Sequence, residues 1–336
     1  MEQLYTKHYQ VAEHIFEVQS NNVALLKLMT NYQSFDITSS CPSHAETIFK
    51  LHIEHSGLLH QEQINLYTHL FTDYSEAEMP RIEIYYTKDS GDWLMRVAQV
   101  ADSPICCELE SNKNFTQGRL CIASDYNDIR FCIDNALMLM YAFRTAPLMT
   151  LEMHAAVVVK KDYVTDNHQP PAKSIVNILN GGLKDSNSKE RGYIFLGHSG
   201  TGKSTHARQW LQTFSDAWLL NDDNPILRVM DDGEVRVYGS PWSGKTPCYK
   251  NAYVRVGGIV KLSQAPHNTL HSLTLPQAYA YILSSVSGLK MIPQMADDIY
   301  ESIKYIITHV RCYHLDCLPN TDAAITCWNE IKGNSL

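Results

Sequence analysis

The residues from Gly197 to Thr205 are of the types from which proteins build a phosphate-binding loop. Their sequence, GHSGTGKST, fits the pattern G-x-x-x-x-G-K-[S/T]. In this pattern glycines let backbone N–H groups turn toward phosphate oxygens, the lysine reaches the terminal phosphates, and the hydroxyl after it binds Mg²⁺. We therefore predict that Lys203 and Ser204 bind a nucleoside triphosphate, ATP, together with Mg²⁺.

The residues on either side predict the setting that such a loop needs. Residues 193–196 form a short apolar run typical of a buried strand. Four apolar residues after the loop recur at the spacing of one helix face: Ala207, Trp210, Leu211 and Phe214. A helix N-terminus offers unpaired N–H groups to an anion, whereas the alternative, a glycine-rich turn with an exposed lysine, would make both flanking patterns accidental. The predicted nucleotide-binding residues are Gly197, His198, Ser199, Gly200, Thr201, Gly202, Lys203, Ser204 and Thr205.

Phosphoryl transfer also needs a group that orients or deprotonates the acceptor. Asp222 and Asp223 follow the apolar run 217–220, so they stand at the end of a predicted strand soon after the loop. We expect one carboxylate to help hold Mg²⁺ and the other to accept a hydroxyl proton. An alternative stays open, because Asp-Asp-Asn-Pro is also good turn chemistry at a solvated strand end.

The elements that position these groups are predicted to form an α/β domain over residues 148–336. Apolar runs and a helical period predict strands at 153–159, 217–220, 225–230, 234–238, 253–262 and 311–315, and helices at 275–286 and 296–308. Residues 231–233 signal a hairpin turn, and 239–245 form a second glycine-bearing loop. The polar insertion 160–191 is expected to be mobile or functional. His154 lies in the first strand, where a lone histidine is usually a core residue.

Residues 1–147 are predicted to form a smaller, β-rich α+β domain that ends near Pro147. We expect a helix over 1–31, strands at 47–53, 81–87 and 118–123, a hairpin turn at 88–92 and a helix over 128–143. No internal repeat is visible. The role of this domain does not follow from its sequence.

The whole composition narrows the classes of partner. The chain has 336 residues, is 44% hydrophobic and carries a formal charge of −8. That length suggests two globular domains, and the absence of a dense Lys/Arg run argues against nucleic acid. No apolar segment is long enough to span a bilayer, and the first residues lack a secretory pattern, so we expect no membrane partner and a cytoplasmic location. A homo-oligomer stays an open alternative.

The nine cysteines include an adjacent pair, Cys106 and Cys107, but no C-x-x-C pair. Their scatter through apolar runs predicts reduced thiols that serve as small core residues. Cys312 and Cys317 match no common zinc spacing, and the five histidines between 44 and 69 lack the i, i+4 pair of a helix-borne metal site. We therefore favour scattered surface histidines over a metal site in that segment.

Four motifs together resemble the HPr kinase/phosphorylase family and its relatives, the phosphoenolpyruvate-carboxykinase-like serine kinases. They are His154-Ala-Ala, GHSGTGKST at 197–205, Leu-Asn-Asp-Asp at 220–223, and Gly-Ser-Pro-Trp-Ser-Gly-Lys at 239–245. The resemblance implies a P-loop kinase domain with a mixed β-sheet. It also implies that His154 handles the transferred phosphate, that Lys203 and Ser204 bind nucleotide and Mg²⁺, that Asp223 is the proton acceptor, and that Asp222 is a metal neighbour.

The chain departs from that family in a later segment, where Tyr253 stands in place of a metal-binding glutamate. This departure puts a second metal contact and the reverse phosphorolysis reaction in doubt. The loop at 239–245 is more similar to stand-alone relatives, including peptide kinases. Trp242 and Lys245 are either contacts for the acceptor or the phosphates, or a packed tryptophan and a solvated lysine.

Three functions are compatible with these residues. The first is a kinase that moves the γ-phosphoryl group of ATP to a hydroxyl, most simply a serine of a protein or peptide. The second is a carboxykinase that uses oxaloacetate, although no cationic cluster for its carboxylates is visible. The third is a non-catalytic binding module that is gated by ATP, which the missing glutamate at Tyr253 motivates.

Overall fold

The computed structural model describes residues 3–73, 80–162, 189–244, 246–288, 290 and 292–332. The chain divides into two compact units, Met1–Thr145 and Ala146–Leu336. Most of the insertion predicted at 160–191, and Lys245 of the second glycine-bearing loop, lie outside the described residues. Within the described parts both units are mixed α/β structures, each built on one sheet.

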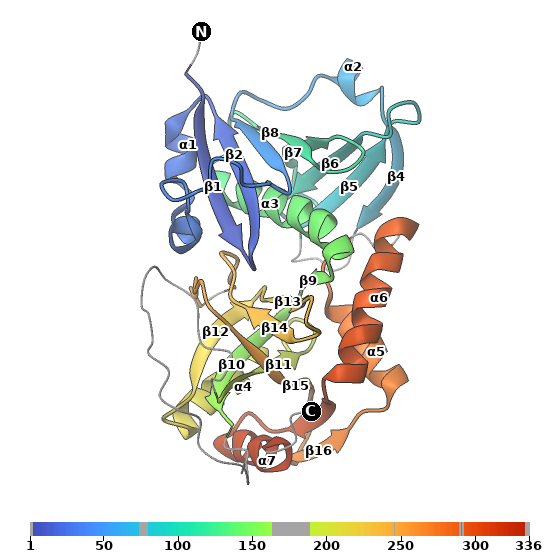
Figure 1. Cartoon of the computed structure of the whole chain (residues 1–336). Helices are drawn as coiled ribbons and strands as arrows, with labels where there is room; N and C mark the ends of the chain where they lie inside the picture. Colours follow the sequence, from blue (N-terminus) through green and yellow to red (C-terminus); the bar gives the residue numbers. More distant parts are fainter. Residues whose placement is uncertain are drawn as a thin grey trace. The chain divides into compact units, whose positions relative to one another are not determined.

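The first unit is built on an eight-stranded sheet with the strand order β1-β2-β3-β8-β7-β6-β5-β4. Its strands are β1 (Tyr5–Val11), β2 (His14–Ser20), β3 (Lys50–Glu54), β4 (Thr68–Asp73), β5 (Arg81–Tyr86), β6 (Trp93–Ala98), β7 (Ile105–Ser111) and β8 (Gln117–Ile122). The long helix α3 (Ile129–Thr145) lies across one face of this sheet and contacts β7 and β8 (Figure 1). The short helices α1 (Val23–Lys27) and α2 (Gln61–Ile64) and the 3₁₀ turn Thr30–Phe35 complete it.

The helix predicted over residues 1–31 is wrong, because β1 and β2 form an antiparallel hairpin there. The turn between them contains Ala12 and Glu13, both with positive φ. Buried positions repeat every second residue, at Tyr9 and Val11 and again at Phe16 and Val18. That two-residue period is the signature of a strand with one buried face. It decides the structure of this segment in spite of the helix-forming residues that the segment also contains.

The other strand, turn and helix predictions for the first unit are confirmed in type and place. Strands β3, β5 and β8 and helix α3 cover the four expected segments, with ends shifted by a few residues. The hairpin turn between β5 and β6 contains Gly91 with a φ of 74°. On α3 the buried face includes Ala136, Leu137 and Met140, as the helical period predicted.

The second unit is built on a nine-stranded sheet with the main order β12-β10-β11-β15-β14-β13-β9, and β17 and β16 extend it from β15. Its strands are β9 (Thr150–Glu152), β10 (Ala155–Lys161), β11 (Glu190–Leu196), β12 (Trp218–Asp223), β13 (Ile226–Val229), β14 (Val235–Tyr238), β15 (Tyr253–Gln264), β16 (Thr269–Ser272) and β17 (Cys312–Cys317). The pairs β11–β15 and β15–β17 are parallel and the others antiparallel, so the sheet is mixed.

Two strand predictions need correction in this unit. The strand expected at 153–159 begins two residues later than predicted, as β10 at Ala155, and a separate short strand, β9, ends before it at Glu152. Met153 bridges to Val286 instead, which places His154 at a break between strands and not inside one. The strand expected at 217–220 continues through Asp223 as β12, so both aspartates belong to the strand and not to a turn after it.

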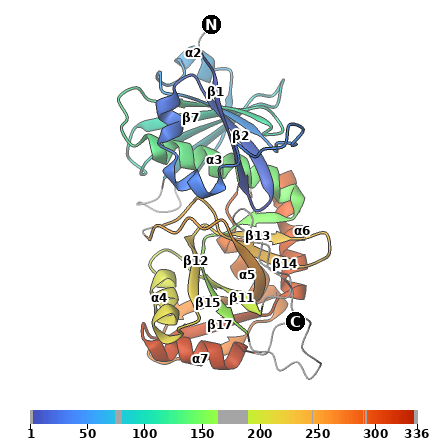
Figure 2. The ribbon, with the colours of Figure 1, turned by 60° about the vertical axis from the view of Figure 1, so that its left-hand side comes forward.

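Helices cover both faces of the second sheet. Helix α4 (Lys203–Thr213) packs on β10, β11 and β12 and against α7 (Thr321–Ile331). Helices α5 (Leu275–Ser285) and α6 (Pro293–His309) pack together, α5 on β11 and α6 on β9 and β13, on the other side of the sheet (Figure 2). Helix α7 was not predicted from the sequence, although Asn320 caps its first turn by accepting a hydrogen bond from the N–H of Ala323.

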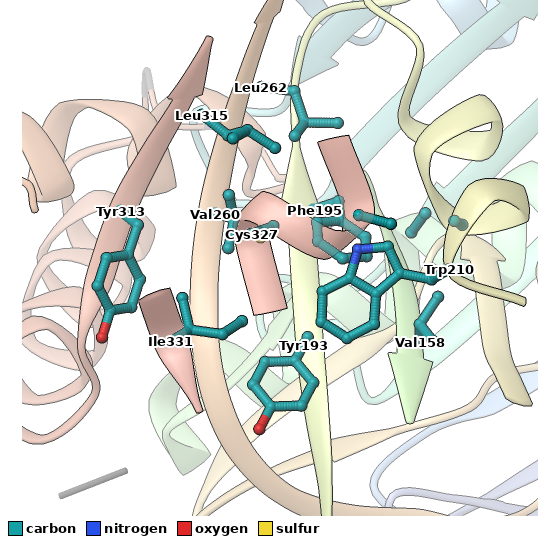
Figure 3. Packing of buried hydrophobic residues seen from close by; sticks show 13 residues of the cluster. Val158, Tyr193, Phe195, Trp210, Val260, Leu262, Tyr313, Leu315, Cys327 and Ile331 are labelled. Atoms are coloured by element: carbon teal, nitrogen blue, oxygen red, sulfur yellow. The ribbon is translucent and has the colours of Figure 1, made fainter. Parts of the chain in front are cut away.

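Helix α4 is fixed by a buried aromatic cluster centred on Trp210 (Figure 3). The indole packs against Tyr193 and Phe195 of β11 and donates a hydrogen bond to Nε2 of His206. Burial lowers the pKa of His206 to about 4, so its ring stays neutral and accepts this bond. Leu211, which was predicted on the buried face, is exposed, so the buried face of α4 is narrower than expected.

Candidate functional site

The sheet register brings three of the four motifs to one edge. Ala155, the first residue of β10, pairs with Leu196 on one side and with Asp223 on the other. His154 therefore precedes β10 at the same edge where the loop leaves β11 and where β12 ends. Strand order thus gathers residues that are far apart in the chain.

The loop between β11 and α4 has the backbone of a phosphate cradle. Gly200 and Gly202 have φ values of 76° and 108°, which other residues rarely adopt. A Cβ atom at either position would meet nothing within 4 Å, so the space above both glycines is open for a ligand. Gln264, the last residue of β15, donates hydrogen bonds to the carbonyl oxygens of Gly200 and Thr201 at 3.3 and 3.5 Å.

Lys203 is buried, and its ammonium donates to the carbonyl oxygen of Gly197 at 2.9 Å. Its side chain thus folds back along the loop at the start of α4, where the N–H groups of the first turn and the helix dipole also favour an anion. The loop residues that face solvent are His198, Ser199, Gly200 and Ser204, while Thr201, Gly202 and Thr205 are half-buried. This arrangement fits the phosphate groups of a nucleotide.

The predicted magnesium ligands lie together. The hydroxyl of Ser204 donates to Oδ1 of Asp222 at 2.8 Å. Hydroxyl and carboxylate oxygens are ligands of the kind that Mg²⁺ takes in nucleotide sites, where substrate phosphates and water complete the shell. The pair therefore fits an Mg²⁺ ion held next to the loop.

Asp223 has an unusual backbone and a histidine neighbour. Its φ is 128°, a value that costs a non-glycine residue on the order of 1–3 kcal/mol and that clusters at functional sites. Nδ1 of His154 lies 3.4 Å from Oδ1 of Asp223, and both side chains are about one-third exposed. Helix α5 fixes His154, because the backbone N–H of His154 donates to the carbonyl oxygen of Ser285 at 2.6 Å.

The second glycine-bearing loop packs against both aspartates. The N–H of Gly244 and the hydroxyl of Ser243 both donate to the carbonyl oxygen of Asp222, at 2.6 and 3.1 Å. A Cβ atom at Gly244 would lie 3.1 Å from Cβ of Asp223, so a side chain there would press on the carboxylate. The side-chain amide of Asn221 stabilises the same loop by donating a hydrogen bond to the carbonyl oxygen of Trp242 at 3.0 Å. The motifs at 220–223 and 239–244 therefore form one structural unit.

Of the two alternatives left open for Trp242, the packed tryptophan is the one observed. Trp242 is buried, with 2% of its surface exposed, and its carbonyl oxygen accepts a hydrogen bond from the side chain of Asn221. Trp242 therefore supports the loop and does not face an acceptor.

The structure adds a site residue that the sequence analysis missed. Glu152, at the end of β9, is buried with 1% of its surface exposed, and within the described residues neither of its carboxyl oxygens has a hydrogen-bond partner. Burial, and then the negative charge of Asp223, raise the pKa of Glu152 to about 8. The only sequence signal was its position two residues before His154. A neutral carboxylic acid therefore stands beside Asp223 at neutral pH.

We expect Glu152→Gln to change the pH dependence of stability. Because the folded pKa is raised, the unfolded chain releases this proton from about pH 4.5 upward while the folded chain keeps it up to about pH 8. The free energy of unfolding of the natural chain should therefore fall with rising pH in this window. The variant lacks this titration. Its free energy of unfolding, measured by denaturant titration, should therefore rise by about 3 kcal/mol relative to that of the natural chain between pH 4.5 and pH 7.

Glu301→Gln is the matched control, since the Glu301 side chain is 66% exposed and pairs only with Lys304 in the described structure. The free energy of unfolding of this control should change with pH in the same way as that of the natural chain over this range. Parallel curves for Glu152→Gln as well would show that Glu152 is not held protonated by the fold.

Tyr253 lies away from the loop. It is the first residue of β15, whereas Gln264, which contacts the loop, is the last. An extended strand of this length spans about 36 Å. Tyr253 packs instead on Tyr238, with ring centroids 5.0 Å apart, and under the guanidinium of Arg236. Position 253 thus holds a packed aromatic ring at the end of β15 opposite to the loop.

No protein-family model matches the chain, and a search of curated proteins gives no match either. In the described part of the chain, no helix has the length and apolar character needed to cross a membrane. The functional evidence is thus the geometry of the site itself, in which a glycine loop, two aspartates and a histidine meet at one sheet edge.

Proposed function

We propose that the protein is a cytoplasmic, Mg²⁺- and ATP-dependent kinase that transfers the γ-phosphoryl group to a hydroxyl, a serine of a protein or peptide. The observation that carries the proposal is the placement of two acids beside the loop. Asp222 binds the hydroxyl of Ser204 at 2.8 Å, and Asp223 lies next in the chain with its carboxylate 3.4 Å from His154. This is the set of groups that phosphoryl transfer requires.

Each residue has a separate task in this reaction. The amides of the loop and the ammonium of Lys203 bind the phosphates and neutralise charge, while Ser204 and Asp222 would hold Mg²⁺, which supplies further charge stabilisation. The acceptor oxygen forms a bond to the γ-phosphorus as the bond to the β-γ bridging oxygen breaks, and ADP leaves. Asp223 accepts the hydroxyl proton, and His154 holds the Asp223 carboxylate in place.

Incubation of the purified protein with γ-labelled ATP, Mg²⁺ and a lysate of the source organism tests the proposal. We expect one main labelled species, whose phosphate survives acid as a serine phosphate does, and no label without Mg²⁺. A heat of binding in calorimetric titration with Mg·ATP and a higher melting temperature, without any labelled product, would favour the ATP-gated binding module instead. Nucleotide-dependent decarboxylation of oxaloacetate would favour the carboxykinase, and no response to Mg·ATP would refute all three.

A further inference from the structure

Three cysteine side chains of the first unit meet in its interior. The Sγ atoms of Cys106, Cys107 and Cys132 all lie within 4.8 Å of one another. The three residues are buried, with 3%, 1% and 0% of their surfaces exposed. Cys106 and Cys107 come from β7, and Cys132 comes from α3, so the thiols join the sheet to the helix that covers it.

A β-bulge explains how two adjacent cysteines contribute to one cluster. In a regular strand, neighbouring side chains point to opposite faces of the sheet. Here Cys107 pairs with Val97 and Ile105 pairs with Ala98, so Cys106 is an extra residue that the register with β6 skips. A bulge of this kind re-aims a side chain and is common next to functional sites. The bulge brings the Cys106 thiol to the side of the sheet where Cys132 lies.

We propose that Cys106, Cys107 and Cys132 form a binding site for a thiophilic d¹⁰ metal ion, Zn²⁺ or Cu⁺. Three thiolates bound to one ion at about 2.3 Å lie about 4 Å apart in a trigonal or tetrahedral arrangement. Separations within 4.8 Å therefore need only a small inward movement of the side chains. Soft thiolate ligands select these ions over Mg²⁺ and Ca²⁺, which prefer oxygen.

Two of the three thiols also have backbone partners. The Cys106 thiol donates to the carbonyl oxygen of Val97 at 3.2 Å, and the Cys132 thiol donates to the carbonyl oxygen of Cys106 at 3.9 Å. A bound metal ion would replace the thiol protons, because thiolates and not thiols are metal ligands.

The buried hydroxyl of Tyr126 stands next to the thiols. It makes no well-formed hydrogen bond within the described residues, although it lies close enough to Cys106 to interact with its thiol. A hydroxyl in this position can contact a bound ion or donate to a metal-bound thiolate. Zn²⁺ prefers four ligands and would use such a group, whereas Cu⁺ is satisfied by the three sulfurs.

Metal titration of the reduced, full-length protein tests the site. One arm adds Zn²⁺ against a chromophoric chelator, and the other adds Cu⁺ against a Cu⁺-specific chelator. We expect one ion per chain in one of the two arms, and a higher melting temperature with that ion than without it. The arm that binds identifies the ion, and absence of binding in both arms overturns the proposal.

Variants then locate the ion. Cys132→Ala and, separately, Cys107→Ala should weaken binding by more than about 100-fold, because losing a ligand costs more than the 10- to 100-fold loss of an outer partner. Cys121→Ala is the matched control, since Cys121 is buried in the same unit but belongs to a different cluster. Unchanged binding in a folded Cys132→Ala protein, or equal loss in Cys121→Ala, would contradict the assignment. The metal stoichiometry of the natural chain needs no variant, so this measurement stands if a variant fails to fold.

Discussion

Asp223→Asn should lower the rate of phosphoryl transfer by about 1,000-fold and leave the Kd for Mg·ATP within about threefold. The asparagine cannot accept the hydroxyl proton, so the loss falls on the chemical step. The loop and Lys203 are untouched, so nucleotide binding persists. Single-turnover transfer from γ-labelled ATP measures the first quantity, and isothermal titration with Mg·ATP measures the second.

Asparagine is the right replacement because of the backbone at this position. The φ of Asp223 is 128°, and a short polar side chain tolerates positive φ better than most others. Asp231→Asn is the control, since it removes the same charge at an exposed position in the turn between β13 and β14. Transfer at the natural rate by Asp223→Asn would end the assignment of this residue as the base, and equal loss in Asp231→Asn would point to a general charge effect.

Lys203→Ala should lose both binding and transfer, with Mg·ATP affinity lower by about 1,000-fold, which corresponds to about 4 kcal/mol. The ammonium is buried at the start of α4, where its charge is poorly screened by water and would face the phosphates directly. Isothermal titration with Mg·ATP and the shift of the melting temperature at saturating Mg·ATP measure the effect.

Lys304→Ala is the control for this variant, because the Lys304 side chain is 61% exposed on α6 and pairs with Glu301. It should bind Mg·ATP as the natural chain does. If Lys203→Ala kept its affinity while its melting temperature without nucleotide fell, the lysine would be a support for the loop through Gly197 and not a phosphate ligand.

The sequence predicted best where local geometry alone determines structure. The glycines of the loop, the apolar run before it and the helical period after it specify a strand, a turn and a helix over a short stretch, and β11 and α4 are found there. The hairpin of β13 and β14 is also found, because Asp-Asp-Gly signals a turn by itself. The helix predicted over residues 1–31 was wrong, because the buried faces of β1 and β2 depend on the sheet that these strands join.

Other features depend on contacts between distant residues, and the sequence by itself could not decide them. It predicted a phosphate-binding loop and Mg²⁺ ligands, because such a prediction depends only on residue type and local backbone. Only the tertiary structure placed His154 beside Asp223, buried Glu152 next to them, and used a bulge to bring Cys106 to Cys132. Strand order and register create these neighbours, and they follow from the packing of the whole sheet and not from any one segment.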